Sequence, residues 1–497
     1  MTSDRTRPNI LLITADEWPG RIAPGDERNA ARIPTLDYLA RLGTTYTRAY
    51  SECPVCIPAR RSLLTGTSPR VHGDRTFQPD ADMPDAPTLP AVLRDHGYQC
   101  FAVGKLHVYP QRDRVGFDDV LLSEEGRSTL GATDDYEAFL ADEGHPGRQF
   151  THGMSNNDYQ VRPWHLPEHT HPTSWAATEM ARMIRRRDPK RPAFWYLSFQ
   201  APHPPLVPPA AFLDMYDRAD IDAPIRGDWV DDRLPFALRQ VMDQWPMGDE
   251  RDVAEARRGV YALCTQIDYA LRVVLGTLRE EGVLDDTIIV FTSDHGDMLG
   301  DHDLWAKRLF YESSARIPML IVGTDGDDRI GVGSIDSRLL GLQDVMPTIL
   351  ELAGVPVPAT SDGTSAVGVE RRSHLYGEFG ESANATRMVT DDRHKLVYYP
   401  AGNRLQLFDL VEDPGELVDL SDVQEHADTL GALRALLISE LYGTDLAWLE
   451  DGQLVGMPDP GGVGSVDRGL HGVRGLHWPP PPITAHPGRV VGAPGEH

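Results

Sequence analysis

Short, uninterrupted hydrophobic runs alternate with amphipathic stretches along roughly the first 350 residues of the chain. The runs at 9–15 and 287–292 contain mainly β-branched and other apolar residues, which is typical of strands buried on both faces. Apolar residues instead recur at helical spacing in 33–42, 173–187 and 253–281. This alternation predicts a doubly wound α/β sheet. Further strands are expected at 46–50, 98–103, 193–199 and 318–322, and further helices at 89–96 and from Gln343.

The pattern changes after about residue 380. Short strands at 387–390, 395–399 and 405–410 are separated by turns, and they predict a small antiparallel sheet that a helix at 424–442 covers. From 451 onward the chain is rich in glycine and proline, which predicts an extended tail. We therefore divide the chain into an α/β domain (1–380), a small antiparallel subdomain (381–450) and a tail (451–497). Exchange of this tail between copies in a homo-oligomer is a hypothesis that rests on its composition alone.

Composition narrows the classes of partner. The formal net charge is −27, and the isoelectric point is about 5.0, which argues against nucleic acid or an anionic membrane as partner. An anionic substrate would need a local cationic pocket. Four cysteines are too few for a disulfide framework. The polar residues 1–8 precede only a short apolar run, which fits neither a signal peptide nor a membrane span and makes a cytoplasmic location the expectation.

The stretch 53–66 joins a predicted strand to a predicted helix. Pro58 is expected to exclude a helix through Cys56, so that a helix starts over 61–64 with its N-terminus facing the thiol. Such an end, with Arg60 beside it, suits an anion. The alternatives are an ordinary junction with a buried thiol and a redox pair of Cys53 with Cys56, for which no thioredoxin-like context is present.

Acidic and imidazole side chains follow two of the predicted strands. Asp16 and Glu17 end the first strand, and Asp294 and His295 follow the strand at 287–292. Ligands bind at the carboxyl ends of strands in open α/β sheets. Carboxylate oxygens bind hard cations, and an added nitrogen donor favours a divalent transition metal. A helix or turn cap is the alternative interpretation of the first acid pair.

Two further strand ends carry basic side chains. Lys105 and His107 alternate around Leu106 after the strand at 98–103, so an extended backbone would direct both to one side. A cation and an imidazole directed together suit a sulfate or phosphate group. Prolines on both sides of His203 fix that imidazole rigidly after the strand at 193–199.

Cys-Ile-Pro-Ala-Arg at 56–60, followed by Ser-Leu-Leu-Thr-Gly at 62–66, resembles the signature of the sulfatase family. Six further motifs occur in family order: the strand end at Asp16, then 67–73, 104–107, 202–204, 293–302 and Lys307. The stretches 407–410 and 413–416 look like the family's C-terminal subdomain. Across most of residues 8–445 the chain resembles the sulfatase branch of the alkaline-phosphatase-like superfamily. This resemblance implies a large mixed sheet sandwiched between helices, with a small C-terminal antiparallel sheet.

Two positions depart from the common sulfatase pattern. Asp16-Glu17 stands where the family usually has two aspartates, so the role of Glu17 as a ligand is open. Asp294-His295 stands where an Asp-Asn pair is usual, and the Asp-His form resembles choline sulfatases and phosphonate monoester hydrolases. The nitrogen ligand shifts the metal preference from calcium toward manganese.

The resemblance implies hydrolysis of a small-molecule sulfate ester. A formylglycine-generating enzyme would oxidise Cys56 to formylglycine, whose hydrated aldehyde is the family's nucleophile. The metal ligands implied are Asp16, Glu17, Asp294, His295 and the modified Cys56. The catalytic residues implied are Cys56, Arg60, Lys105 and Lys307 for charge stabilisation, His203 or Lys307 for the leaving alcohol, and His107 as a proton acceptor. A phosphonate monoester or phosphodiester hydrolase that uses the same residues is the alternative activity, and an inert relative that binds anions or metal is the alternative from another class.

Overall fold

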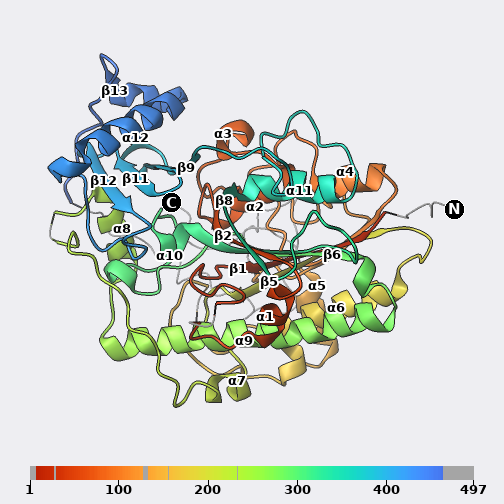
Figure 1. Cartoon of the computed structure of the whole chain (residues 1–497). Coiled ribbons are helices and arrows are strands. Elements are labelled where there is room, and N and C mark those ends of the chain that lie inside the picture. Colours follow the sequence, from red (N-terminus) through yellow and green to blue (C-terminus); the bar gives the residue numbers. More distant parts are fainter. Residues whose placement is uncertain (1–6, 27–28, 127–132, 155, 232, 463–497) are drawn as a thin grey trace.

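The computed structural model describes residues 7–462 except 27–28, 127–132, 155 and 232. An eight-stranded sheet with the order β4-β3-β5-β1-β6-β7-β2-β8 crosses the middle of the molecule (Figure 1). Its strands are β1 (Asn9–Asp16), β2 (Thr44–Tyr50), β3 (Gln99–Gly104), β4 (Asp119–Leu122), β5 (Ala193–Pro202), β6 (Thr287–Ser293), β7 (Arg316–Val322) and β8 (Ser334–Gly341). Strand β7 runs antiparallel to both neighbours, whereas the other pairs are parallel. The predicted mixed sheet is confirmed.

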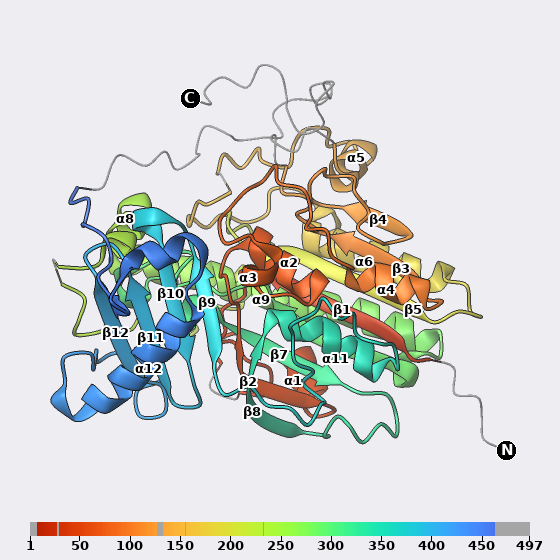
Figure 2. The same cartoon turned by 90° about the horizontal axis from the view of Figure 1, so that it is seen from above.

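Helices cover both faces of this sheet, as Figures 1 and 2 show. The central strand β1 explains why: Leu11 and Ile13 belong to one hydrophobic core, whereas Ile10 and Leu12 belong to the other. Successive strand residues point to opposite faces, so an uninterrupted apolar run requires cover on both sides. The first core is closed by α1 (Pro34–Ala40), α6 (Pro172–Arg186) and α9 (Glu250–Glu280). The second is closed by α2 (Cys56–Thr65), α4 (Leu89–Asp95) and α11 (Val345–Leu352).

Shorter elements fill the connections. The remaining α-helices are α3 (Pro69–His72), α5 (Asp135–Asp142), α7 (Ala210–Asp214), α8 (Phe236–Gln244), α10 (Glu312–Ala315) and α12 (Ala427–Glu440). The 3-10 turns are η2 (Glu168–Thr170), η3 (Leu284–Asp286), η4 (Asp301–Asp303), η5 (Leu342–Asp344), η6 (Ser382–Asn384), η7 (Gln424–His426) and η8 (Gly443–Trp448). Within the described ranges, no helix is both long and apolar enough to cross a membrane.

The predicted small antiparallel sheet is also present. It has the order β12-β11-β10-β9, and α12 packs on it around a separate core. Its strands are β9 (Leu375–Phe379), β10 (Thr386–Thr390), β11 (His394–Tyr399) and β12 (Arg404–Asp409), and the hairpin β13 (Leu449–Glu450) and β14 (Gln453–Leu454) follows. The edge strand β9 comes from before residue 381, so the small sheet begins within the range assigned to the first domain. Most of the predicted tail, 463–497, lies outside the described residues.

Buried ion pairs join the small sheet to the large one. Lys395 of β11 is fully buried, and its Nζ lies 2.6 Å from Glu312 of α10. Arg75, which follows α3, lies 2.9 Å from Glu378 of β9 and 3.0 Å from Asp445 of η8. Because a buried charge is costly without its partner, each pair holds the two parts of the chain in a fixed relation.

Helix α2 begins at Cys56, so the prediction that Pro58 excludes a helix there is wrong. Pro58 occupies the first turn, where a backbone N–H has no intrahelical acceptor and the absence of that N–H costs nothing. Val55 precedes the helix in extended conformation, with φ −153° and ψ 141°, and Gly66 ends it with φ 64°. The first turn of α2 therefore carries Cys56, and the helix N-terminus lies at the thiol.

Candidate active site

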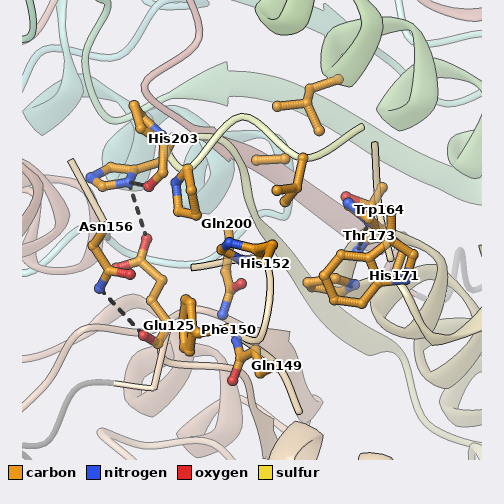
Figure 3. A pocket seen from close by; sticks show the side chains of 16 residues that line it. Glu125, Gln149, Phe150, His152, Asn156, Trp164, His171, Thr173, Gln200 and His203 are labelled. Atoms are coloured by element: carbon orange, nitrogen blue, oxygen red, sulfur yellow. Dashed lines mark hydrogen bonds and ion pairs between the residues drawn. The ribbon is translucent and has the colours of Figure 1, made fainter. Parts of the chain in front are cut away.

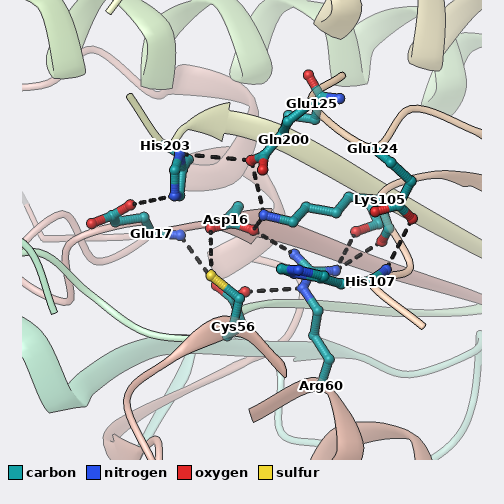
Figure 4. Close-up of polar contacts among 12 residues, drawn as sticks. Asp16, Glu17, Cys56, Arg60, Lys105, His107, Glu124, Glu125, Gln200 and His203 are labelled. Atoms are coloured by element: carbon teal, nitrogen blue, oxygen red, sulfur yellow. Dashed lines mark hydrogen bonds and ion pairs between the residues drawn. The ribbon is translucent and has the colours of Figure 1, made fainter. Parts of the chain in front are cut away.

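Two neighbouring parallel strands, β1 and β6, bring their carboxyl ends to one place. Asp16 is the last residue of β1, and β6 pairs with β1 in parallel, with Ala15 opposite Ser293. Asp294 and His295 follow β6 directly and therefore reach the same edge of the sheet as Asp16. The first turn of α2 adds Cys56 from the side (Figure 4). The site thus forms where the residues that follow parallel strands meet a helix N-terminus.

Four buried donors converge at this edge. Asp16, Cys56, Asp294 and His295 each offer one ligand atom, and these atoms lie within 4.8 Å of one another. Cys56 Sγ lies 3.2 Å from His295 Nε2 and 3.7 Å from Asp16 Oδ1. His295 Nδ1 lies 3.0 Å from the Gly296 carbonyl, and a proton donated there leaves the Nε2 lone pair directed at the group. Two carboxylates and an imidazole around one point fit a divalent cation.

Arg60 binds both carboxylates of this group. It lies one helical turn after Cys56 on α2, its Nη2 is 3.0 Å from Asp16 Oδ2, and its Nε is 3.0 Å from Asp294 Oδ2. Burial alone raises the pKa of Asp16, but the Lys105 ammonium and the Arg60 guanidinium outweigh it and hold that pKa well below its usual range. Asp16 is therefore an anion at neutral pH and available to a cation.

Glu17 turns away from the four-donor group. Its φ of 65° is left-handed, and its Oε2 lies 2.6 Å from Lys307 Nζ and 3.3 Å from His203 Nε2. Glu17 instead forms a second candidate metal group with Asp16 and His203, also within 4.8 Å. Burial raises the pKa of Glu17 well above its usual range, although Lys307 opposes the shift. The structure thus brings Glu17 and Lys307 to the site, but on the side of His203.

Lys105 and His107 do not lie on one extended face as the sequence predicted. His107 has a φ of 58°, so the backbone turns between the two residues. Lys105 Nζ lies 2.5 Å from Asp16 Oδ2 and 2.8 Å from Glu125 Oε1. The backbone N–H of His107 donates to Glu124 Oε1 at 2.9 Å, and its ring is buried beside the site (Figure 4). Both residues therefore lie at the site, although not on one extended backbone face.

Sequence reasoning missed the acids Glu124 and Glu125. They follow β4, a short strand in which only Leu122 is buried, so the hydrophobic pattern does not indicate it. Both side chains are buried, and Glu125 Oε1 lies 3.6 Å from His203 Nδ1 as well as beside Lys105. No motif in the sequence indicates this pair of acids.

Two more missed residues are Tyr159 and Asp297. The Tyr159 hydroxyl donates to Asp297 Oδ2 at 2.6 Å and lies 3.4 Å from Glu17 Oε1. His302, the last residue of the motif at 293–302, accepts a hydrogen bond from Gly227 N at 3.0 Å and packs on Trp229. His302 is therefore a structural histidine. Cys53 is a buried free thiol outside the four-donor group.

Comparisons with known proteins agree with this geometry. The sequence model of the sulfatase family matches residues 8–355, and one described as N-sulphoglucosamine sulphohydrolase, C-terminal, matches residues 300–441. The chain is 32% identical to an arylsulfatase of Clostridium perfringens over 470 residues, which cover 90% of this chain and 97% of that protein. It is 30% identical to a choline-sulfatase of Rhizobium meliloti over 438 residues, which cover 84% and 83%.

The fold has solved counterparts. The phosphonate monoester hydrolase of Agrobacterium radiobacter aligns with a TM-score of 0.72 at 23% identity, over 89% of this chain and 98% of that one. At this identity the likeness concerns the fold, which is the expected alkaline-phosphatase-like one. The sequence matches, which span most of the chain, assign the family as well as the fold. The chain belongs to the sulfatase family and is a sulfuric ester hydrolase.

Proposed function

We propose that the chain hydrolyses the sulfate ester of a small molecule with formylglycine, made from Cys56, as its nucleophile. The observation that carries this proposal is the group of Asp16, Asp294 and His295 around Cys56 Sγ at the N-terminus of α2. A helix N-terminus and a buried guanidinium favour negative charge at this point. The thiol itself suits the role poorly, because burial, with Asp16 beside it, raises the pKa of Cys56 to about 11.

The donor set supports a resident divalent cation. Asp16, Asp294 and His295 would hold it, together with the modified residue 56. Such a cation supplies a lowered pKa at a bound hydroxyl and withdraws charge from the sulfate group. The imidazole of His295 favours manganese over calcium. Glu17 lies in the second group, so we assign it to Lys307 and His203 rather than to the cation.

Cationic and imidazole side chains surround the position where sulfate would lie. The ammonium groups of Lys105 and Lys307 lie within 2.6 Å of Asp16 and Glu17, respectively, and would stabilise charge on the transferring group. His203 is placed rigidly: its backbone N–H donates to the Asp16 carbonyl at 3.1 Å, and its ring Nδ1 lies 2.6 Å from the Pro204 carbonyl. Burial lowers the pKa of His203 to about 3, so this imidazole is neutral at pH 7 and would orient the departing alcohol. The Lys307 ammonium, which binds the same Glu17 carboxylate, would supply the proton, with His107 accepting one from residue 56.

A phosphonate monoester or phosphodiester hydrolase is the second candidate. The fold shared with phosphonate monoester hydrolases and the Asp-His pair at 294 and 295 favour it. The match of the family model and the identity to an arylsulfatase favour the sulfate ester.

The test requires protein made together with a formylglycine-generating enzyme, with mass spectrometry of the peptide that contains residue 56. We expect a much larger kcat/KM for a nitrophenyl sulfate than for a nitrophenyl phosphonate monoester, and loss of activity in Cys56→Ala. Cys53→Ala is the matched control and should keep full activity, because Cys53 lies outside the donor group. A preference for the phosphonate would move the protein to the second activity. No turnover of either ester, with formylglycine present, would indicate a narrow substrate pocket, whereas an unmodified Cys56 would support the inert relative.

A further inference from the structure

A pocket adjoins the site at His203 (Figure 3). His203 and Glu125 stand at one end of it, and Trp164 and His171 stand at the other. His203 Nε2 lies 3.3 Å from Glu17 within the reacting centre, whereas its Nδ1 lies 3.6 Å from Glu125, which lines the pocket. A group that leaves the sulfur next to His203 therefore has this pocket as its neighbouring space.

The walls of the pocket are largely apolar and aromatic. Phe150 packs edge-on against His152 at 5.8 Å, and Trp164 against His171 at 5.1 Å. Prolines and aliphatic side chains complete the lining: Pro172, Ala201, Pro204, Pro205, Val207 and Leu263. Walls of this kind bind a ring or another apolar body and exclude water from it.

The described part of the lining contains no lysine or arginine side chain, and Glu125 contributes a carboxylate. Burial lowers the pKa of His152 to about 4 and that of His171 to about 3, so both imidazoles are neutral at pH 7. A second anionic group on a substrate would lose its hydration here without gaining a countercharge.

Two polar atoms of the lining, Gln149 Oε1 and Thr173 Oγ1, have no hydrogen-bond partner among the described residues. Both side chains are more than nine-tenths buried. Buried polar atoms are nearly always hydrogen-bonded in folded proteins. A hydroxyl group on a bound molecule would satisfy them.

We propose that this pocket binds the organic part of the sulfate ester, and that this part is a ring-bearing alcohol or phenol with no second anionic group. The proposal rests on the proposed function for the position of the reacting sulfate. It separates this chain from sulfatases that act on polysulfated saccharides, because the described lining offers no cation to a second sulfate. Phe150 and Trp164 then determine specificity for the ring, and Gln149 and Thr173 bind a polar substituent on it.

The test compares two esters on the matured enzyme: 2-naphthyl sulfate and its ring-sulfonated analogue, which differ by one anionic group. We expect kcat/KM to be at least about 30-fold lower for the sulfonated ester, because the added charge is buried without a partner. Gln149→Lys supplies a cation in the lining and should reduce the difference in kcat/KM between the two esters. Phe150→Ala should raise KM for 2-naphthyl sulfate about tenfold while kcat changes little.

Tyr38→Ala is the matched control, because this aromatic residue lines a separate groove with Leu42 and Ile330. It should leave both esters unaffected. Calorimetric binding of 2-naphthol, with Phe150→Ala for comparison, tests the pocket without chemistry. If no sulfate ester is hydrolysed but 2-naphthol binds and the substitution weakens it, the proposed function fails while the pocket assignment holds. Equal kcat/KM for the two esters, or unchanged KM and naphthol affinity in Phe150→Ala, would overturn the inference.

Discussion

Lys105 Nζ lies 2.8 Å from Glu125 Oε1, and the same ammonium lies 2.5 Å from Asp16 Oδ2. One buried cation is thus shared between a carboxylate of the candidate metal group and a carboxylate of the adjoining pocket. The strength of each contact depends on the other, because both acids compete for one positive charge. Glu125 therefore belongs to the site although no sequence motif indicates it.

Glu125→Gln should lower kcat/KM by about tenfold while the bound metal stays unchanged. The amide oxygen can still accept from Lys105, but the ammonium is then drawn toward Asp16 and away from the sulfate position. Steady-state kinetics and elemental analysis on the same sample measure both quantities. Glu137→Gln, which changes a buried acid in the capping box of α5, is the control and should alter thermal stability alone. Unchanged kcat/KM in Glu125→Gln would show that Glu125 does not contribute to the reaction.

Arg60→Lys should lower kcat/KM by at least about 100-fold, because one ammonium cannot span Asp16 and Asp294 as the guanidinium does. Arg61→Lys is a matched control from the next position of α2. Arg61 binds Asp74 at 2.9 Å and lies outside the donor group, so its substitution should leave kcat/KM within about twofold of wild type. Equal losses in the two variants would show that α2 had been disturbed as a whole.

His295→Ala should abolish stoichiometric metal binding, whereas Glu17→Gln should retain it. The first change removes a donor of the four-donor group, and the second changes a side chain that binds Lys307 instead. Elemental analysis after gel filtration, followed by addition of Mn²⁺ or Ca²⁺ to chelator-treated enzyme, measures the effect. Metal loss in Glu17→Gln would make Glu17 a ligand after all.

His171→Asn should make the protein less sensitive to acid. His171 Nδ1 accepts from Thr173 N at 3.1 Å and caps α6, and burial lowers the pKa of this imidazole to about 3. Below about pH 6.5 the unfolded chain therefore binds a proton that the folded chain does not, so the free energy of unfolding falls as pH falls. Between pH 7 and pH 5 this loss is about 2 kcal/mol.

Asparagine keeps a capping oxygen but does not titrate, so the difference in unfolding free energy between pH 7 and pH 5 should shrink by that amount. Urea unfolding at the two pH values measures it. His169→Asn, at a largely exposed neighbouring position, is the control and should leave the difference unaltered. The same pH dependence in wild type and His171→Asn would contradict the assignment.

The hydrophobic pattern predicted those parts of the fold that are buried on both faces. Strands β1 and β6 read as continuous apolar runs because each side chain meets one of two cores, and their ends correctly brought Asp16, Asp294 and His295 to one edge. Strands β4 and β8 escaped prediction because they lie at the sheet edges and expose much of their length, which dilutes the signal.

Reasoning from local sequence failed in two places. Pro58 was expected to break the helix, yet it fits the first turn of α2. An extended backbone was expected at His107, yet Glu124 accepts from its N–H and from that of Leu106 and holds a left-handed turn. The first error arises because the helix start was placed too late, although proline is tolerated in a first turn. The second arises because Glu124, which holds the turn at His107, is distant in sequence and follows a short strand with a weak apolar signal.

The ion pair between Arg75 and Asp445 has a consequence for how the protein is made in the cell. Arg387 binds the same carboxylate at 2.6 Å, so both guanidinium groups depend on a residue near the end of the described chain. During translation they leave the ribosome well before Asp445 does, and domains usually fold in the order of their synthesis. The last stage of folding must therefore wait until Asp445 has left the ribosome. A premature stop before codon 445 would leave two buried positive charges without this carboxylate. Cellular quality control would then recognise the misfolded product before it could act on a substrate.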